Sequence, residues 1–337
     1  MKISVKKISE LSGFSQATVS NALTGKRRVG RETAEKILRI AREHGYAVEK
    51  RVRRIRVVTY RDSGEVFSDS PFFSALLEGI ENECRAKGYE TTIINLYCRH
   101  EDYGEQVEAL LADRGSGIIL IGTELTEETA RVFQEATVPL VVVDCWLPRV
   151  PMNAVLMENE DSVMEAVEYL IHQGHRAIGY IKSNVRIQNF ECRARGFFRA
   201  LAAHGIAPED RFIIEVPPST QGAHAVFEEM IAAGRRMPTA FFADNDMMAL
   251  GAMQTLQAHG FRVPQDISIV GFDDIVFSQS FSPGLTTISV HKKELGQAAV
   301  RRLIELVHEP EQPIQRIQLV NELILRGSVA MPPGEEE

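Results

Sequence analysis

Residues 5–46 read VKKISELSGFSQATVSNALTGKRRVGRETAEKILRIAREHGY. The apolar positions before Gly13 have the i, i+3, i+6 spacing of one face of a short helix: Val5, Ile8 and Leu11. Gly13 suits the positive φ of a tight turn, and Ser15 offers an N-cap hydroxyl for a second helix that reaches Leu23. A third helix is predicted over residues 31–44, with the core-facing residues Ala34, Ile37, Leu38 and Ala41. Two short helices joined by a glycine-containing turn of three residues form a helix-turn-helix.

The charge of the chain is divided unequally. Residues 1–56 carry 15 Lys+Arg against 5 Asp+Glu, and the remaining 281 residues carry 23 against 41. The net charges of the two parts are therefore +10 and −18, and together they give the formal net charge of −8. A basic head on an acidic body predicts a polyanionic partner at one end of the chain.

The second helix begins with polar residues, which suits a helix that enters the DNA major groove with its first turn. Gln or Asn can pair there with adenine through two hydrogen bonds, and an alanine methyl can pack on thymine. Hydroxyl and arginine side chains suit the phosphates. We expect DNA contacts from Val5, Ser15, Gln16, Ala17, Thr18, Asn21, Arg27, Arg28, Arg51 and Arg53. A generic three-helix interaction module is the alternative.

This head resembles the DNA-binding domain of the LacI/GalR family of bacterial repressors. The resemblance rests on the S-x-x-T-V-S pattern of residues 15–20, on Val29 and Thr33, and on the Gly45-Tyr46 ending. It implies a transcriptional regulator, a repressor, that binds double-stranded operator DNA. A homodimer is expected, because two heads would bind the two half-sites of a pseudo-palindrome.

The segment after Tyr46 departs from that family. Its members usually continue with Pro-Asn and a hinge helix whose leucine wedges into the minor groove. Here the chain continues AVEKRVRR over residues 47–54, and Val52 is the one apolar candidate for a wedge. We hypothesise that Arg51, Arg53 and Arg54 hold the DNA backbone instead. A flexible basic linker without this role is an equally good interpretation.

From Ile55 onward, short β-branched runs alternate with helical patterns. The predicted strands are residues 55–60, 90–97, 117–122 and 138–144, followed by 177–181, 212–216, 239–243 and 267–272. This alternation predicts an α/β sensor of two doubly wound lobes with parallel sheets. RARGFFRAL (193–201) and ISIVGFDDI (267–275) resemble the sensor domain of the same family, which implies a fold like that of periplasmic binding proteins.

The expected domain limits follow from these patterns and from the resemblance. They are 1–46 for the helix-turn-helix, 47–54 for the basic linker, 55–330 for the effector-binding domain and 331–337 for a tail. The resemblance implies discontinuous lobes: lobe one of about 55–160 plus 290–318, and lobe two of about 161–288 plus 320–330. The crossovers between them are expected near 158–162, 286–291 and 316–322.

Ligands of open α/β sheets lie beyond the carboxyl ends of the strands. The expected effector site consists of residues that follow strand ends and of one arginine, Arg193, which by the resemblance points at the ligand. Its members are Phe72, Phe73, Trp146, Arg193, Asn245 and Asp273. Carboxylate, amide and aromatic groups suit a sugar or sugar derivative, although Arg193 could instead pair with an anionic effector. The alternatives are core positions for the two phenylalanines, a surface anchor for Trp146 and a surface charge for Arg193.

Several other function classes lack their sequence signals. No GxGxxG or P-loop follows the first strand of either lobe, and no Ser lies in a G-x-S-x-G turn, so we expect no catalytic residue and no cofactor. Cys84, Cys98, Cys145 and Cys192 form no CxxC pair, so no metal is expected. No apolar run approaches about 20 residues and no signal peptide is evident, so we expect a cytoplasmic protein without a membrane partner. A transport-type binding protein and a sugar- or nucleotide-converting enzyme are the rival functions.

Overall fold

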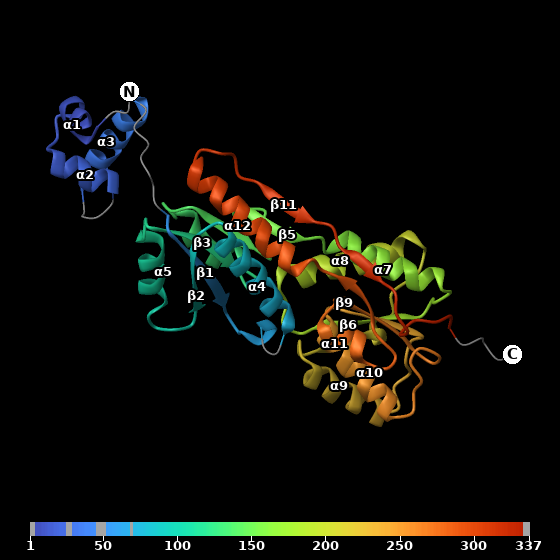
Figure 1. The fold of residues 1–337 in the computed structure, drawn as a ribbon. Coiled ribbons are helices and arrows are strands. Elements are labelled where there is room, and N and C mark those ends of the chain that lie inside the picture. Colours follow the sequence, from blue (N-terminus) through green and yellow to red (C-terminus); the bar gives the residue numbers. More distant parts are fainter. Residues whose placement is uncertain (1–3, 25–28, 45–51, 68–69, 333–337) are drawn as a thin grey trace.

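The computed structural model describes residues 4–24, 29–44, 52–67 and 70–332. They form a helical head followed by two α/β lobes (Figure 1). The predicted fold class is therefore confirmed: an all-α head and two doubly wound sheets, each almost entirely parallel.

The head contains three helices: α1 (Val5–Ser12), α2 (Gln16–Thr24) and α3 (Arg31–Glu43). Gly13 ends α1 with a φ of 76°, which is the left-handed conformation that glycine adopts without steric cost. The head core consists of Ile8, Val19, Leu23, Ile37 and Ala41. These positions follow the helical spacing of the sequence, so packing of the three apolar stripes positions α2 on the other two helices.

Lobe one contains a six-stranded parallel sheet in the order β11-β5-β4-β3-β1-β2. Its strands are β1 (Arg54–Arg61), β2 (Glu90–Tyr97), β3 (Ser116–Ile121), β4 (Leu140–Val143), β5 (Ala154–Met157) and β11 (Arg316–Leu319). α4 (Pro71–Ala86) and α12 (Lys292–His308) cover one face, and α5 (Tyr103–Ala112) and α6 (Glu127–Gln134) cover the other. A short 3₁₀ helix, Glu65–Phe67, precedes α4.

Lobe two contains the second sheet, in the order β12-β10-β9-β8-β6-β7. Its strands are β6 (Ile178–Ser183), β7 (Ile213–Val216), β8 (Ala240–Ala243), β9 (Ser268–Asp273), β10 (Thr286–Ser289) and β12 (Glu322–Ile324). Only β12 runs antiparallel to its neighbour among the described strands. The helices are α7 (Glu160–His172), α8 (Gln188–Ala203), α9 (Thr220–Ala232), α10 (Asp246–Ala258) and the short α11 (Val276–Ser280), together with a 3₁₀ turn at Asp210–Phe212.

The chain passes between the two sheets at three places. Residues 158–159 connect β5 to α7, residues 290–291 connect β10 to α12, and residues 320–321 connect β11 to β12. Each lobe therefore contains chain segments that are far apart in the sequence. The domain limits expected from the sequence remain a prediction.

Helices α4 and α12 pack closely against each other on lobe one (Figure 1). A Cβ atom at Gly79 would lie 2.2 Å from the carbonyl oxygen of Lys293, and one at Gly296 would lie 2.6 Å from the carbonyl oxygen of Leu76. The two backbones thus approach each other where neither helix has a side chain, and glycine is required at both positions.

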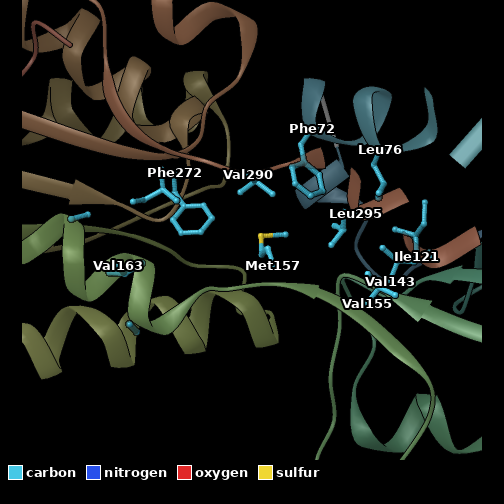
Figure 2. Close-up of a cluster of buried hydrophobic side chains, with 14 of the residues drawn as sticks. Phe72, Leu76, Ile121, Val143, Val155, Met157, Val163, Phe272, Val290 and Leu295 are labelled. Carbon is cyan, nitrogen blue, oxygen red and sulfur yellow. The ribbon is translucent and has the colours of Figure 1, made fainter. Parts of the chain in front are cut away.

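One hydrophobic core extends through both lobes. Figure 2 shows Met157 and Val290 between Phe272 of lobe two and Phe72 of lobe one. Met157 immediately precedes the crossover at residues 158–159, and Val290 lies in the crossover at residues 290–291. The crossovers are therefore packed into apolar surroundings, which places the strand ends of the two lobes close together.

The sheet begins earlier than predicted. Val52 is buried at 8% exposure, the amide of Arg53 donates to the carbonyl of Gly115 at 3.2 Å, and β1 begins at Arg54. β1 therefore begins one residue before the strand predicted over residues 55–60, and the linker limits of 47–54 remain a prediction. Val52 is packed in lobe one, so a role as an apolar wedge in DNA is not supported.

Candidate functional site

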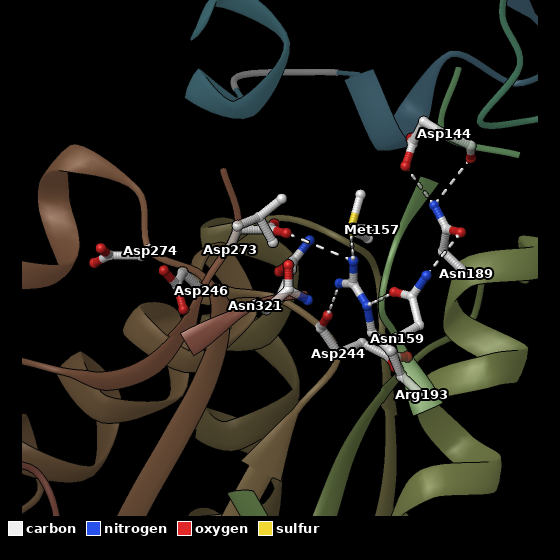
Figure 3. Close-up of polar contacts among 12 residues, drawn as sticks. Asp144, Met157, Asn159, Asn189, Arg193, Asp244, Asp246, Asp273, Asp274 and Asn321 are labelled. Carbon is white, nitrogen blue, oxygen red and sulfur yellow. Dashed lines mark hydrogen bonds and ion pairs between the residues drawn. The ribbon is translucent and has the colours of Figure 1, made fainter. Parts of the chain in front are cut away.

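Polar side chains from both lobes meet at the carboxyl ends of the strands. Figure 3 shows Arg193 of α8 at the centre of this group. The other members follow β4, β5, β8 and β9 or lie on α8: Asp144, Asn159, Asn189, Asp244 and Asp273. All of them are buried.

Arg193 is held on every side. Its Nε donates to Oδ1 of Asn159 at 2.9 Å, and its Nη1 donates to the carbonyl oxygen of Asp244. Its Nη2 lies 3.6 Å from Oδ1 of Asp273, and the guanidinium lies 3.6 Å from the ring centroid of Phe272. The guanidinium is therefore fixed in one orientation, with a carboxylate beside it and an aromatic face against it.

Asn189 links the two lobes. Its Nδ2 donates to the carbonyl oxygen of Asp144 at 3.1 Å and to Oδ1 of the same residue at 2.6 Å. Asn159 in turn donates from Nδ2 to Oδ1 of Asn189 at 3.1 Å, and Thr123 donates to Oδ2 of Asp144 at 2.5 Å. A chain of hydrogen bonds thus runs from Arg193 through Asn159 and Asn189 to the end of β4.

A second buried carboxylate, Asp244, fixes another arginine. It accepts hydrogen bonds from Oη of Tyr180 at 2.5 Å, the amide of Ser183 at 2.8 Å and Nη1 of Arg186 at 2.7 Å. Nη2 of Arg186 is buried and has no hydrogen-bond partner among the described residues. Such an unsatisfied donor could bind an acceptor oxygen of a ligand.

The carboxyl groups of this site are poorly solvated. Burial raises the pKa of Asp144 to about 6, although the Thr123 hydrogen bond and the charge of Arg193 oppose the shift. Burial also raises the pKa of Asp273, against the charges of Arg193 and Lys292. The pKa of Asp244 is raised by burial as well, against the charge of Arg186. The carboxyl groups of the cluster therefore bind a proton more readily than a solvated carboxyl does, because burial outweighs the nearby donors and positive charges.

The backbone at this edge is strained. Asp144, Asp273 and Asp274 have φ values of 66°, 114° and 51°, and they are the described residues other than glycine with positive φ. Asp144 and Asp273 end strands in the two lobes and carry two of the carboxylates of the site. Strain of this kind concentrates at functional sites, because the surrounding structure must hold it in place.

The structure brings some of the expected effector residues together. Arg193 and Asp273 form the ion pair described above, and Asn245 lies beside Asp244, where its side chain caps α10 by accepting from the amide of Met248 at 2.9 Å. Phe72 belongs to the core shared by the lobes.

Two expected aromatic residues lie elsewhere. Phe73 is partly buried against Phe67, with ring centroids 4.2 Å apart. Trp146 is partly buried against the core on the face of the lobe-one sheet that α5 and α6 cover, and the guanidinium of Arg316 lies 5.2 Å from its ring centroid. None of the contacts given for Trp146 reaches the Arg193 group in the described structure, so the surface-anchor interpretation fits its position better.

Four members of the site are absent from the effector residues expected from the sequence: Asp144, Asn159, Asn189 and Asp244. Asp144 and Asp244 lie at the carboxyl ends of the predicted strands 138–144 and 239–243, so the strand-end rule points to both. Asn159 follows β5, which is not among the predicted strands, and Asn189 lies one helical turn before Arg193.

The expected DNA-binding face lies on α2. Ser15 accepts a hydrogen bond from the amide of Thr18 at 3.1 Å, so it caps the helix as predicted. Gln16 and Ala17 are exposed, and Thr18 and Asn21 are partly buried. Val5 packs partly buried against the head core. Arg53 is exposed at the edge of lobe one, whereas three further expected contacts lie outside the described residues: Arg27, Arg28 and Arg51.

The described residues contain no group of three or more His, Cys, Asp or Glu residues that could hold a metal ion. Among the same residues, the structure has no helix with the length and apolar character that crossing a membrane requires.

Comparison with domain families gives two matches. Residues 4–48 match the family described as bacterial regulatory proteins, lacI family, and residues 167–329 match the periplasmic binding protein-like domain. The chain is 31% identical to the HTH-type transcriptional repressor PurR of Vibrio vulnificus over 329 residues. This alignment covers 96% of the chain and 98% of the relative, and the repressor of the same name from Pasteurella multocida is 30% identical over the same coverage.

Two solved structures are similar over most of the chain. The lac repressor dimer bound to operator and the anti-inducer ONPF has 26% identity and a TM-score of 0.72, covering 98% of this chain and 100% of that one. A LacI family transcriptional regulator from Enterococcus faecium with bound ribose has 26% identity and a TM-score of 0.69, covering 82% and 99%.

Proposed function

Because this chain belongs to the LacI family of bacterial regulatory proteins and is a DNA-binding transcriptional regulator, we propose a specific mode of action for it. It acts as a dimeric repressor. Its operator affinity is set by a sugar-like effector that binds between the two lobes at Arg193.

The DNA-binding part of the proposal rests on α2 and the charge of the head. Gln16 and Ala17 at the start of the helix are exposed. In this proposal they contact base edges, and Ser15 and Thr18 contact phosphate. The net charge of +10 over residues 1–56 attracts the negatively charged DNA. The lac repressor dimer, whose structure is similar over 98% of this chain, is bound to its operator.

The dimer is supported by two groups of exposed apolar side chains. Ile93 and Tyr97 project from β2, the edge strand of lobe one, and are 54% and 38% exposed. Val276 and Phe277 of α11 are 69% and 52% exposed in lobe two. Exposed apolar residues on both lobes suit a two-fold interface along the length of the sensor, as expected for a dimer that places two heads on one operator.

The chemistry of the cleft favours a neutral, donor-rich ligand. Asp144, Asp244 and Asp273 are desolvated carboxyls around one central arginine, so an anionic effector would meet further negative charge. The hydroxyl groups of a sugar can donate to these carboxylates and accept from Arg193 and from the unsatisfied Nη2 of Arg186. The ribose-bound relative is consistent with this class. The single observation that carries the proposal is the Arg193–Asp273 pair surrounded by acceptors from both lobes.

The proposed mechanism uses the inter-lobe hydrogen bonds. Asp144 belongs to lobe one, whereas Asn189, Arg193 and Asp273 belong to lobe two. A ligand that takes over the hydrogen bonds between Asn189 and Asp144 changes how the lobes close on each other. Closure moves the two copies of lobe one in the dimer and therefore the two heads.

We propose binding without turnover at this site. Nε2 of His175 lies 3.1 Å from Oγ of Ser268, the kind of contact that a catalytic serine makes with its base. This pair is fully buried at the start of β9, whereas Arg193 lies at the other end of the strand. The same histidine nitrogen lies 2.9 Å from the carbonyl oxygen of Ala330. His175 is therefore assigned to holding the end of the chain.

The experiment is a thermal-shift screen of pentoses, hexoses, disaccharides, sugar phosphates and nucleobases. A cleft ligand at 100 times its Kd should stabilise the protein by roughly 2.7 kcal/mol. Arg193→Met should abolish the shift. Arg195→Met, on the same helix but with an exposed guanidinium paired to Glu160, should retain it. A sugar that shifts all three proteins equally would refute the assignment, and a shift confined to sugar phosphates would refute the neutral class.

A further inference from the structure

Two arginines at the amino-terminal edge of lobe one lack acidic partners. Arg53 immediately precedes β1, and Arg114 lies in the turn that leads into β3. Both are exposed, and neither guanidinium has a hydrogen bond, ion pair or ring contact within the part of the chain that the structure describes. Unpaired arginines at one edge are available to a polyanion.

Arg53 and Arg114 lie just before neighbouring strands. The amide of Arg53 donates to the carbonyl oxygen of Gly115, the residue after Arg114, at 3.2 Å, and Arg54 is in register with Ser116. Neighbouring strands are about 4.8 Å apart. Each DNA strand carries one phosphate per ~3.4 Å of helix axis. Two exposed arginine side chains that start from neighbouring strands can therefore reach phosphates of one DNA backbone.

The acidic residues of this edge already have partners. Asp113 lies 2.5 Å from Nη2 of Arg56 and accepts from Oγ of Ser116 at 2.8 Å, and hydrogen bonds and arginine charges hold its pKa below the usual range despite the opposing effect of burial. Glu90 lies 3.8 Å from Arg54. The four arginines and two acids leave a local charge of +2, on a body whose total charge is negative.

The covalent chain keeps this edge near the DNA. Eight peptide units separate His44, which follows α3, from Val52, which is buried in lobe one. Even a fully extended chain would span at most about 28 Å over this length. That is less than one helical turn of B-DNA, about 34 Å. With the head in the groove, the edge of lobe one must stay close to the operator and its flanks.

We propose that lobe one itself contacts the operator backbone, through Arg53 and Arg114. This inference rests on the proposed DNA-binding function and adds the sensor to the DNA interface. The partner is double-stranded DNA, recognised through its phosphates without regard to sequence. Because the contacts come from the lobe that moves on effector binding, they couple effector binding to operator affinity directly.

The test measures the salt dependence of DNA binding by the full-length dimer, on an operator obtained by selection from random duplexes. Each lost phosphate contact should reduce the slope of log K against log salt by about 0.9. Arg53→Ala/Arg114→Ala should therefore reduce the slope by about 3.6 for a dimer that carries four such arginines. Arg114→Ala alone, far from the head in sequence, should reduce it by about 1.8, and unspecific DNA should show the same reductions.

Two controls isolate the contact from the change in net charge. Arg235→Ala/Arg236→Ala removes two exposed, adjacent arginines of lobe two and should leave the slope unchanged. Arg53→Lys/Arg114→Lys keeps the charge and should keep most of the slope. Equal slopes for the wild type, for Arg53→Ala/Arg114→Ala and for Arg114→Ala would overturn the proposal. A wild type that selects no operator would overturn the proposed function itself.

Discussion

The Nδ2 atom of Asn189 lies 2.6 Å from Oδ1 of Asp144, and this hydrogen bond joins the start of α8 in lobe two to the end of β4 in lobe one. The same amide donates to the carbonyl oxygen of Asp144 at 3.1 Å. Asp144 also has the left-handed φ of 66°. One amide therefore holds a strained, buried strand end of the opposite lobe.

Asn189→Ala should destabilise the protein by about 1–3 kcal/mol, because Asp144 keeps only the Thr123 donor and its buried acceptor is left unsatisfied. Urea unfolding at pH 7.5 measures the loss. A double-mutant cycle with Asp144→Asn should give a coupling free energy of about 0.5–3 kcal/mol. Additive effects of the two substitutions on the free energy of unfolding would show that Asn189 and Asp144 are not energetically coupled.

Stability should also depend on the protonation of Asp144. Burial raises its pKa to about 6, above the unfolded value of about 3.9. The folded state then binds the proton more tightly, so the contribution of Asp144 to the free energy of unfolding rises as pH falls from about 6 to about 4. It should amount to about 3 kcal/mol at full protonation, from 1.36 kcal/mol per pKa unit.

Asp144→Asn cannot titrate and serves as the reference for this effect. The difference in unfolding free energy between the wild type and this variant should change in favour of the wild type between pH 7.5 and pH 4.5. A difference that stays constant over this range would mean that Asp144 is well solvated or fully paired.

The close approach of α4 and α12 predicts a strong effect at one glycine. Gly79→Ala would place a Cβ 2.2 Å from the carbonyl oxygen of Lys293, so the helices must separate. We expect a loss of about 2–3 kcal/mol, as for overpacked cores. Gly104→Ala in α5 has no atom within 4 Å of the new Cβ and should stabilise by up to about 1 kcal/mol. Equal effects of the two substitutions would contradict this packing.

The exposed start of α2 predicts a change in base preference. Gln16→Ala should weaken operator binding by about 1–3 kcal/mol per half-site and relax the preference at one base pair, because a bidentate contact is lost. The salt slope should stay the same, since no phosphate contact changes. Competition binding on operators with single base-pair changes measures both. Gln134→Ala, an exposed glutamine of lobe one, should bind every operator as the wild type does.

Much of the fold could be predicted from local patterns. The strand 90–97 has the predicted bounds, because a run rich in β-branched residues is distinct from the apolar stripe of a helix. The strand β5 (Ala154–Met157) was not predicted, because four residues are too few to show the period of a strand. The strand β12 has only three residues and is shorter still.

The site was harder to predict, for physical reasons. Asn159 follows β5, so missing that strand concealed the residue, and Asn189 becomes important only through its contact with the other lobe. Trp146 was expected in the cleft because it follows β4, yet its side chain packs against the core on one face of the lobe-one sheet. The side to which a loop residue turns after a strand depends on packing that a single sequence does not contain.

We expect an effector at Arg193 to control the binding of operator DNA by the heads. Fluorescence anisotropy of a labelled operator, titrated with protein in the presence and absence of the sugar found by thermal shift, measures this control. The sugar should change the operator Kd of the wild type by at least about tenfold, a coupling of about 1.4 kcal/mol, and leave that of Arg193→Met unchanged. An operator Kd of the wild type that is the same with and without the sugar would contradict this expectation.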